Sequence, residues 1–388
     1  MCASGRKLVL DLPLKVILTE QGASHFISQK KKLLRFRLAD NVEEYGVQFQ
    51  SFTPCSLQKM LLADYVSKIE ISMPEFVSSR QEIMDLSKLI VFSVLYKQFD
   101  RQILNNVLET DCVRRYNRQH PSELLDQKTQ MRDSDLRSFF SGKDETIEAA
   151  RKKILEPIWA TIVNNAELNP KEKNIQLLMA EKYLNRLSLF NWYIIIKFFK
   201  TDGFPEILRA IRSTHSEYME RSKVAEYISL MVMELALNSE NANMRKEAAI
   251  MYRGLQDNEK LVFDPEIRKK IIQELTRKNE LVFISWKLGG GSASIGKQGR
   301  IQITLYNKND EFQEVKENIE TKKSANVNKK SLIDFYRELP DGQEGTDLGL
   351  YYLSYLDEAC KKVNVKFESL VNQYSSSDLT VINLIFNF

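Results

Sequence analysis

The spacing of apolar residues changes twice along the chain and so predicts three regions. Segments 14–18 and 34–38 are apolar or alternate between apolar and polar residues, which is typical of β-strands. Gly22 and Gly46 are predicted as turns between such strands. The pattern therefore predicts a small β-rich N-terminal module over residues 1–73.

Residues 74–203 carry a helical pattern, with apolar residues recurring every three or four positions. Long helices are predicted over residues 74–108, 144–164 and 170–200. Pro157 is predicted to kink the second of these helices. Helices that follow one another in this way could form an antiparallel hairpin that binds a protein partner or a second copy of the chain. Thr201–Pro205 interrupts the pattern and marks a domain boundary.

Residues 204–388 mix helical and strand patterns, so the chain as a whole is predicted to be α+β. Apolar residues form one stripe of an amphipathic helix over Ser222–Asn238: Val224, Ile228, Met231 and Leu235. Strands are predicted after it, over residues 280–286, 300–306, 365–370 and 379–388. The first two of these strands would form a hairpin.

Composition excludes several classes of protein. The 388 residues are 43% hydrophobic and 28% charged, and the net charge of +4 is spread along the chain, which does not favour nucleic-acid binding. The four cysteines are isolated, which disfavours a disulfide framework and a zinc site. Residues 1–22 carry charges throughout, and the most apolar run, Leu187–Phe199, is too short to span a bilayer. The sequence predicts a cytoplasmic protein without membrane insertion.

Glu234 and Asn238 form the first candidate for chemistry. They lie four residues apart on the helix predicted over Ser222–Asn238, so both project from one face. A carboxylate and a carboxamide in this arrangement could orient a water molecule and ligate Mg²⁺ through oxygen. The alternative is a solvated helix edge that ends at an asparagine.

Gly291–Lys297 fits the pattern G-x-x-x-x-G-K of a phosphate-binding P-loop. Gln298 stands where that motif has Ser or Thr, and the next predicted element is a strand where the motif requires a helix. A flexible hairpin loop is therefore the favoured interpretation.

Gly345–Leu350, with the sequence GTDLGL, opens a predicted helix that extends to about Lys362. The unpaired amides and positive dipole at such a helix start suit an anion. The polar segment from Glu311 to Lys330 precedes it, followed by Phe335 and Arg337 in an FYR sequence.

These features, in this order, resemble the ATP-binding domain of the GHKL superfamily, which includes histidine kinases, gyrase-type ATPases and anti-sigma-factor kinases. The resemblance covers about residues 205–388. It implies a Bergerat-type α/β sandwich, with a mixed sheet covered by helices, for the domain 204–388. It also implies a lid over residues 311–344, and ATP and Mg²⁺ as cofactors.

The resemblance implies a role for each matching residue. Asn238 would ligate Mg²⁺, and Glu234 would be the catalytic base or a polar support. Asn307 would contact the adenine at the end of its strand. The remaining nucleotide contacts would come from the lid and the glycine box: Phe335, Arg337, Gly345, Thr346, Gly349 and Leu350.

The sequence also departs from the family pattern. Asp347 replaces the middle glycine of the box, where a carboxylate would repel a phosphate, and no glycine follows Asn307. His215 lies only 19 residues before Glu234, too close for a phosphoacceptor, and is expected to be an exposed helical histidine. The hairpin region 144–200 contains no histidine, so autophosphorylation on histidine is not expected.

The sequence thus predicts a cytoplasmic signalling or regulatory protein with a divergent histidine-kinase-like ATP-binding domain. Protein partners are expected, with a homodimer as one arrangement. Enzymatic activity is left open, with its absence favoured. Two alternatives remain: an active ATPase or serine kinase of the anti-sigma type, and a nucleotide-free pseudo-kinase that acts as a scaffold in a larger assembly.

Overall fold

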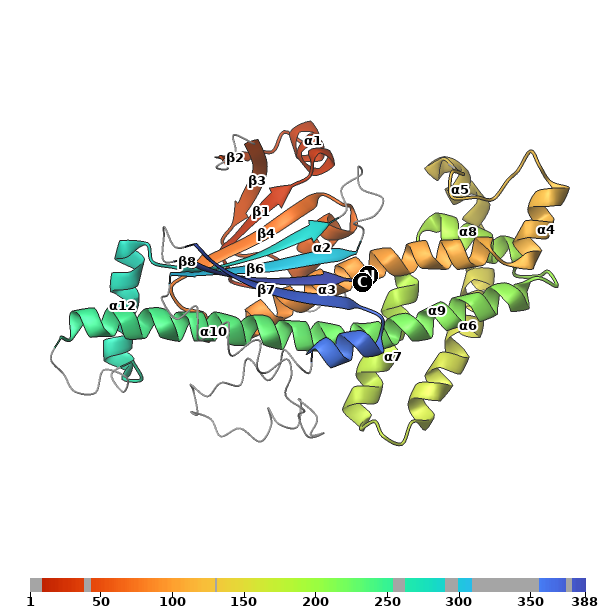
Figure 1. The fold of residues 1–388 in the computed structure, drawn as a ribbon. Coiled ribbons are helices and arrows are strands. Elements are labelled where there is room, and N and C mark those ends of the chain that lie inside the picture. The colour runs from red at the N-terminus through yellow and green to blue at the C-terminus, as the bar shows by residue number, and fades with distance from the viewer. Residues whose placement is uncertain are drawn as a thin grey trace. The chain divides into compact units, whose positions relative to one another are not determined.

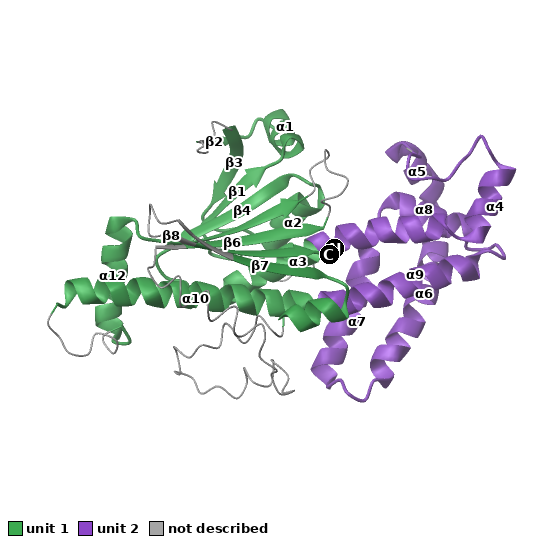
Figure 2. Ribbon diagram, viewed as in Figure 1, with its two compact units in different colours: residues 1–93, 224–388 green, residues 94–223 purple. Residues whose placement is uncertain are grey.

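The chain forms two compact units (Figure 2). The computed structural model describes residues 9–37, 43–129, 131–253, 262–289, 299–308, 356–374 and 379–388. Unit 1 comprises residues 1–93 and 224–388, and unit 2 comprises residues 94–223. Helix α3 (Arg80–Leu108) begins in unit 1 and ends in unit 2.

Unit 1 is built on an eight-stranded sheet with the order β2-β3-β1-β4-β5-β6-β8-β7 (Figure 1). The strands are β1 (Leu14–Leu18), β2 (Leu34–Arg37), β3 (Glu43–Phe49), β4 (Val66–Met73), β5 (Val282–Gly289), β6 (Arg300–Lys308), β7 (Lys366–Tyr374) and β8 (Leu379–Asn387). Every neighbouring pair of these described strands is antiparallel. The chain is thus α+β as predicted, but the sheet is antiparallel where a mixed sheet was expected.

The N-terminal and C-terminal strands join in the middle of this sheet, where β4 pairs with β5. Ile69 lies opposite Trp286 and Ile71 opposite Ile284, and all four side chains are almost completely buried. If β4 were an edge strand, Ile69 and Ile71 would lose the apolar contacts that β5 provides, and more of their surface would be exposed to water. The predicted boundaries at residues 73 and 204 therefore differ from the division into units: the N-terminal strands share the sheet of the C-terminal region.

Short helices also interrupt the N-terminal region that was expected to be β-rich. These are α1 (Glu20–Ser28) and α2 (Pro54–Leu62). Gly22 lies inside α1 and Gly46 inside β3, so neither glycine forms the predicted turn. Each of these helices spans only nine residues, too few for a helical period to stand out in the sequence.

Helix α10 (Val224–Met251) packs on β5 and β6, and runs along the sheet in Figure 1. It continues well beyond Asn238, where the predicted helix ended, and contacts helix α12 (Pro265–Lys278). Residues 356–362 are helical and lead into β7. The predicted hairpin β5–β6 is confirmed, and the two strands predicted over residues 365–370 and 379–388 form the antiparallel pair β7–β8.

Ion pairs fix α10 against the first part of α3. Arg80 lies 3.7 Å from Glu234, and Lys88 lies 2.7 Å from Glu226. As the chain advances along α3 from Arg80 to Lys88, the paired residues run backwards along α10 from Glu234 to Glu226. The two helical segments are therefore antiparallel. The start of α3 thus lies beside the middle of α10.

Unit 2 is helical, as predicted. Besides the second part of α3 it contains α4 (Asp111–Gln119), α5 (Asp133–Phe140), α6 (Asp144–Asn164), α7 (Pro170–Asn185), α8 (Leu189–Phe198) and α9 (Phe204–Ser222). Pro157 lies inside α6, and α6 contacts α7 as expected for consecutive helices joined by a short connection. The single helix predicted over 170–200 is instead two helices, because Ser188 caps a new one: its hydroxyl accepts a hydrogen bond from the Asn191 amide.

No helix among the described residues is long and apolar enough to cross a membrane.

Gly22 allows α1 to approach the backbone of Tyr65. The Thr19 amide donates to the Tyr65 carbonyl over 3.0 Å, and the Thr19 hydroxyl donates to the Asp64 carbonyl over 2.7 Å. A Cβ atom on Gly22 would lie 2.2 Å from the Tyr65 carbonyl oxygen. The helix start is therefore too close to residue 65 for a side chain at position 22.

Gly22→Ala is expected to destabilise unit 1 although alanine favours helix. The gain in helix propensity is about 1 kcal/mol, whereas overpacking against backbone costs about 1–3 kcal/mol or more. Chemical denaturation should show a net loss of stability. Ser24→Ala, at an exposed position of the same helix, should be neutral or slightly stabilising. A Gly22→Ala protein as stable as Ser24→Ala would contradict the close approach.

Candidate functional site

Helix α10 carries the residues that the sequence singled out. Its apolar stripe is buried as predicted: Val224, Ile228, Met231 and Leu235 are at most 3% exposed. Glu234 and Asn238 lie one helical turn apart beside this stripe. The Glu234 side chain is 15% exposed and that of Asn238 is exposed to solvent. The helix therefore presents a carboxylate and a carboxamide together at its surface.

Glu234 also interacts with the start of α3. Its Oε1 lies 3.7 Å from a guanidinium nitrogen of Arg80. The sequence reasoning did not include Arg80, because residue 80 lies far outside the region that carries the resemblance. This arrangement offers oxygen atoms that suit a hard cation such as Mg²⁺, with a guanidinium close by that suits a phosphate.

Of the remaining predicted site residues, Asn307 alone lies in the described part of the chain. The backbone of Asn307 pairs with Thr380 near the end of β6, as expected for a strand-terminating position. Asp347 and the lid 311–344 lie outside the described residues. So do six of the predicted site residues: Phe335, Arg337, Gly345, Thr346, Gly349 and Leu350. The P-loop-like segment 291–297 also lies outside them, and the elements on its two sides are the strands β5 and β6.

Glu240, which sequence reasoning missed, is the most unusual carboxylate of α10. Its side chain is fully buried, and one oxygen accepts hydrogen bonds from the Phe76 amide over 2.5 Å and the Val77 amide over 3.3 Å. The other oxygen bonds to Arg268 of α12, which also lies 3.2 Å from Glu75. Burial raises the pKa of Glu240 to about 7, against the opposing effect of the two amides and Arg268.

Glu247 forms a second buried contact between α10 and α12. It is 1% exposed, and Lys278 donates to both of its oxygens over 2.7 and 2.8 Å. An apolar cluster of Met244, Ala248, Val262, Ile271 and Leu275 surrounds the junction of the two helices. Glu240 and Glu247 thus hold neighbouring segments against α10, whereas Glu234 and Asn238 face its accessible side.

The histidines occupy structural positions. His215 of α9 is fully buried, where an exposed histidine was expected, and its Nε2 lies 2.9 Å from the Ala180 carbonyl oxygen. Burial lowers its pKa, which favours the neutral ring. His25 stacks on Tyr65 and His120 stacks on Tyr116. The enclosed His215 ring does not have the access to solvent that a phosphoacceptor requires.

No group of three or more His, Cys, Asp or Glu side chains in the described ranges is arranged to hold a metal ion. None of the described cysteines Cys55, Cys112 and Cys360 forms a disulfide, and burial raises the pKa of Cys360 to about 12. Such a thiol stays protonated and is a poor nucleophile.

Comparisons with known proteins place the chain among relatives. The model of a family of unknown function, DUF8084, matches residues 5–388. An uncharacterised protein of Treponema pallidum (strain Nichols) is 38% identical over 389 residues, which covers the whole of both chains. No solved structure matches. The chain therefore belongs to the DUF8084 family of unknown function.

Proposed function

We propose that residues 205–388 are a divergent GHKL-type ATP-binding domain, with a Bergerat-type arrangement, that binds Mg²⁺-ATP beside α10. One observation carries this proposal. A helix that presents Glu234 and Asn238 packs on the hairpin β5–β6, and β7–β8 follows in the same sheet. This is the order in which the GHKL domain arranges its acidic helix, central hairpin and closing strands.

The exposed side of α10 fits the chemistry that this proposal needs. The Asn238 carboxamide oxygen is accessible and would ligate Mg²⁺, which prefers oxygen donors and keeps several waters. Glu234 would orient or deprotonate a water molecule next to the terminal phosphate. Asn307, Phe335, Arg337 and the glycine-box residues Gly345, Thr346, Gly349 and Leu350 would complete the nucleotide contacts, as the resemblance implies.

The proposed role is regulatory, in the cytoplasm, without autophosphorylation on histidine. The burial of His215 supports this last point. ATP would favour one of two states of the lid 311–344 and thereby change the contacts made with protein partners. The helical hairpin α6–α7 is the proposed place for such a partner or for a second copy of the chain.

The unchanged protein is expected to bind Mg²⁺-ATP in titration calorimetry, and Asn238→Ala is expected to abolish this binding. The substitution removes one metal ligand at an exposed position, so folding should be unaffected. Asn174→Ala, which removes an exposed helical asparagine of unit 2, is the matched control and should bind normally. Absence of heat and of a thermal shift at about millimolar ATP with the unchanged protein would refute the proposal.

Asp347 favours a second candidate function, the nucleotide-free scaffold. A carboxylate within about 5 Å of a triphosphate would repel it by several kcal/mol. If the scaffold interpretation holds, Glu234→Ala and Asn238→Ala leave cellular activity intact. An active ATPase or serine kinase would instead lose phosphate transfer in Glu234→Ala while keeping ATP binding. These two outcomes separate the candidates.

A further inference from the structure

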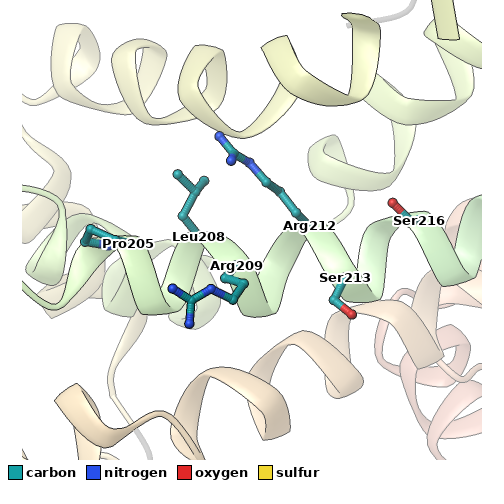
Figure 3. Close-up of a pocket in the computed structure, with 6 residues that line it drawn as sticks. All are labelled: Pro205, Leu208, Arg209, Arg212, Ser213 and Ser216. Atoms are coloured by element: carbon teal, nitrogen blue, oxygen red, sulfur yellow. The ribbon is translucent and has the colours of Figure 1, made fainter. Parts of the chain in front are cut away.

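A cavity of about 450 Å³ lies on one face of α9, within unit 2 (Figure 3). The guanidinium groups of Arg209 and Arg212, which belong to its lining, point to opposite sides of the helix. Arg212 is also engaged, because it donates to the Lys153 carbonyl over 2.7 Å. These side chains do not converge on one ligand, whereas an edge of the sheet in unit 1 offers a continuous binding surface.

This edge is the outer side of β7. The strand is the last one of the sheet beyond β8, and none of the described strands pairs with its other side (Figure 1). Its nine residues pair with β8 in one unbroken register, from Lys366 opposite Asn387 to Tyr374 opposite Leu379. The outer side of β7 therefore presents an uninterrupted row of main-chain donors and acceptors.

The opposite edge of the sheet, β2, is protected in ways that β7 is not. It has only four residues, two of which are arginines, and Arg35 forms an ion pair with Glu43 of β3. Short length and charge are devices by which natural sheets prevent pairing at an edge. In contrast, β7 contains no proline or glycine and has no bulge in its pairing with β8. The difference indicates that the edge at β7 is available for pairing.

The exposed residues of β7 suit a second copy of the same strand. Leu370 stands at the centre of the strand and is 50% exposed, on the same side of the sheet as the exposed residues Lys366 and Glu368. If two β7 strands pair antiparallel over their full length, Leu370 lies opposite Leu370 of the second copy, on the two-fold axis. Lys366 and Glu368 then lie opposite uncharged residues. An axis at Glu368 would instead place two carboxylates face to face, which disfavours that register.

We propose that β7 is a dimerisation edge, at which two copies of the chain pair through antiparallel β7 strands and join their sheets into one. Main-chain hydrogen bonds along the strands supply the affinity, and the Leu370 pair supplies an apolar contact at the axis. The pairing occupies the β7 edge of both copies, so the assembly closes at two chains. The hairpin α6–α7 is then left for a different protein.

Leu370→Lys tests the pairing. Sedimentation velocity of the full chain should show a reversible equilibrium between monomer and dimer. The substitution should raise the dissociation constant about ten-fold or more, because two lysines then face each other in place of an apolar pair. Leu34→Lys is the matched control: Leu34 is 44% exposed on the other edge strand, β2, so this variant should dimerise as the unchanged protein does. Both positions are exposed, so both variants should fold normally, which circular dichroism checks.

Leu370→Cys tests the register. Residues directly opposite each other in an antiparallel pair have Cα atoms about 4.5–5.5 Å apart, which is within the range of a disulfide. Mild oxidation should therefore link two Leu370→Cys chains, whereas Leu34→Cys, with the same native cysteines, should stay unlinked.

Two results would overturn the proposal. One is a monomer up to about 100 μM unchanged protein, which would mean that another part of the chain or a different protein covers the edge. The other is a dimer that Leu370→Lys and Leu34→Lys weaken equally and that Leu370→Cys does not cross-link, because the copies would then meet elsewhere. Asn238→Ala should dimerise normally, so failure here and failure of the ATP proposal are distinguishable.

Discussion

Above a pH of about 7, where Glu240 is ionised, replacing it with alanine is expected to lower the free energy of unfolding by about 3–5 kcal/mol, the usual cost of breaking a buried ion pair from one side. The substitution leaves the Phe76 and Val77 amides without their acceptor and removes one partner of the largely buried Arg268. It also opens a cavity between α10 and residues 76–77. Urea denaturation followed by circular dichroism measures the loss.

Glu226→Ala is the matched control on the same helix. Glu226 pairs with Lys88 of α3, but its side chain is 42% exposed, and exposed ion pairs contribute about 0–1 kcal/mol. The two variants remove the same chemical group from the same helix, α10, and differ in the burial of that group. A Glu240→Ala protein that loses no more stability than Glu226→Ala would show that the buried contacts at Glu240 are not a structural anchor.

Glu240 also bears on the candidate nucleotide site, through a short chain of contacts. It holds the amides of residues 76 and 77, which lie just before α3. Arg80, the first residue of α3, contacts Glu234. Loss of Glu240 should therefore displace Arg80 and change the surroundings of Glu234, although the two carboxylates lie on different sides of α10.

The sequence predicts well those parts of the fold that depend on local periodicity. Helix α10 and the hairpins β5–β6 and β7–β8 each have an apolar pattern that reads directly as helix or strand. The pairing of β4 with β5 was missed, because it joins Lys68 to Lys287 across more than half of the chain. No local pattern encodes such a partner, so the N-terminal strands were taken for a separate module.

The same limit applies to the candidate site. The four-residue spacing of Glu234 and Asn238 predicts a shared helix face, and the structure confirms their adjacency on α10. Glu240 gives no such signal, since its partners come from residues 76–77 and from α12. His215 was expected at the surface, but contacts with Phe99 and Tyr183 enclose it. Burial depends on partners that are distant in sequence.

Because of Glu240, the free energy of unfolding of unit 1 should also depend measurably on pH. Burial raises its pKa to about 7 from the usual 4.5, and nearby Glu75 acts in the same direction. The Phe76 and Val77 amides and Arg268 favour the ionised form without reversing the shift. Between these two pKa values the folded protein holds a proton on Glu240 that the unfolded chain has released. Raising the pH across this window therefore favours unfolding.

We expect the free energy of unfolding of the unchanged protein, measured relative to Glu240→Gln, to fall as the pH rises from 4.5 to about 7. The slope is at most about 1.4 kcal/mol per pH unit, which gives a total of the order of 3 kcal/mol. Glutamine keeps the size and an acceptor oxygen but does not titrate, so the difference isolates Glu240 from all other groups. Urea denaturation of both proteins at several pH values tests this. A difference that stays constant, or rises with pH, would mean that Glu240 is ionised throughout and held by Arg268.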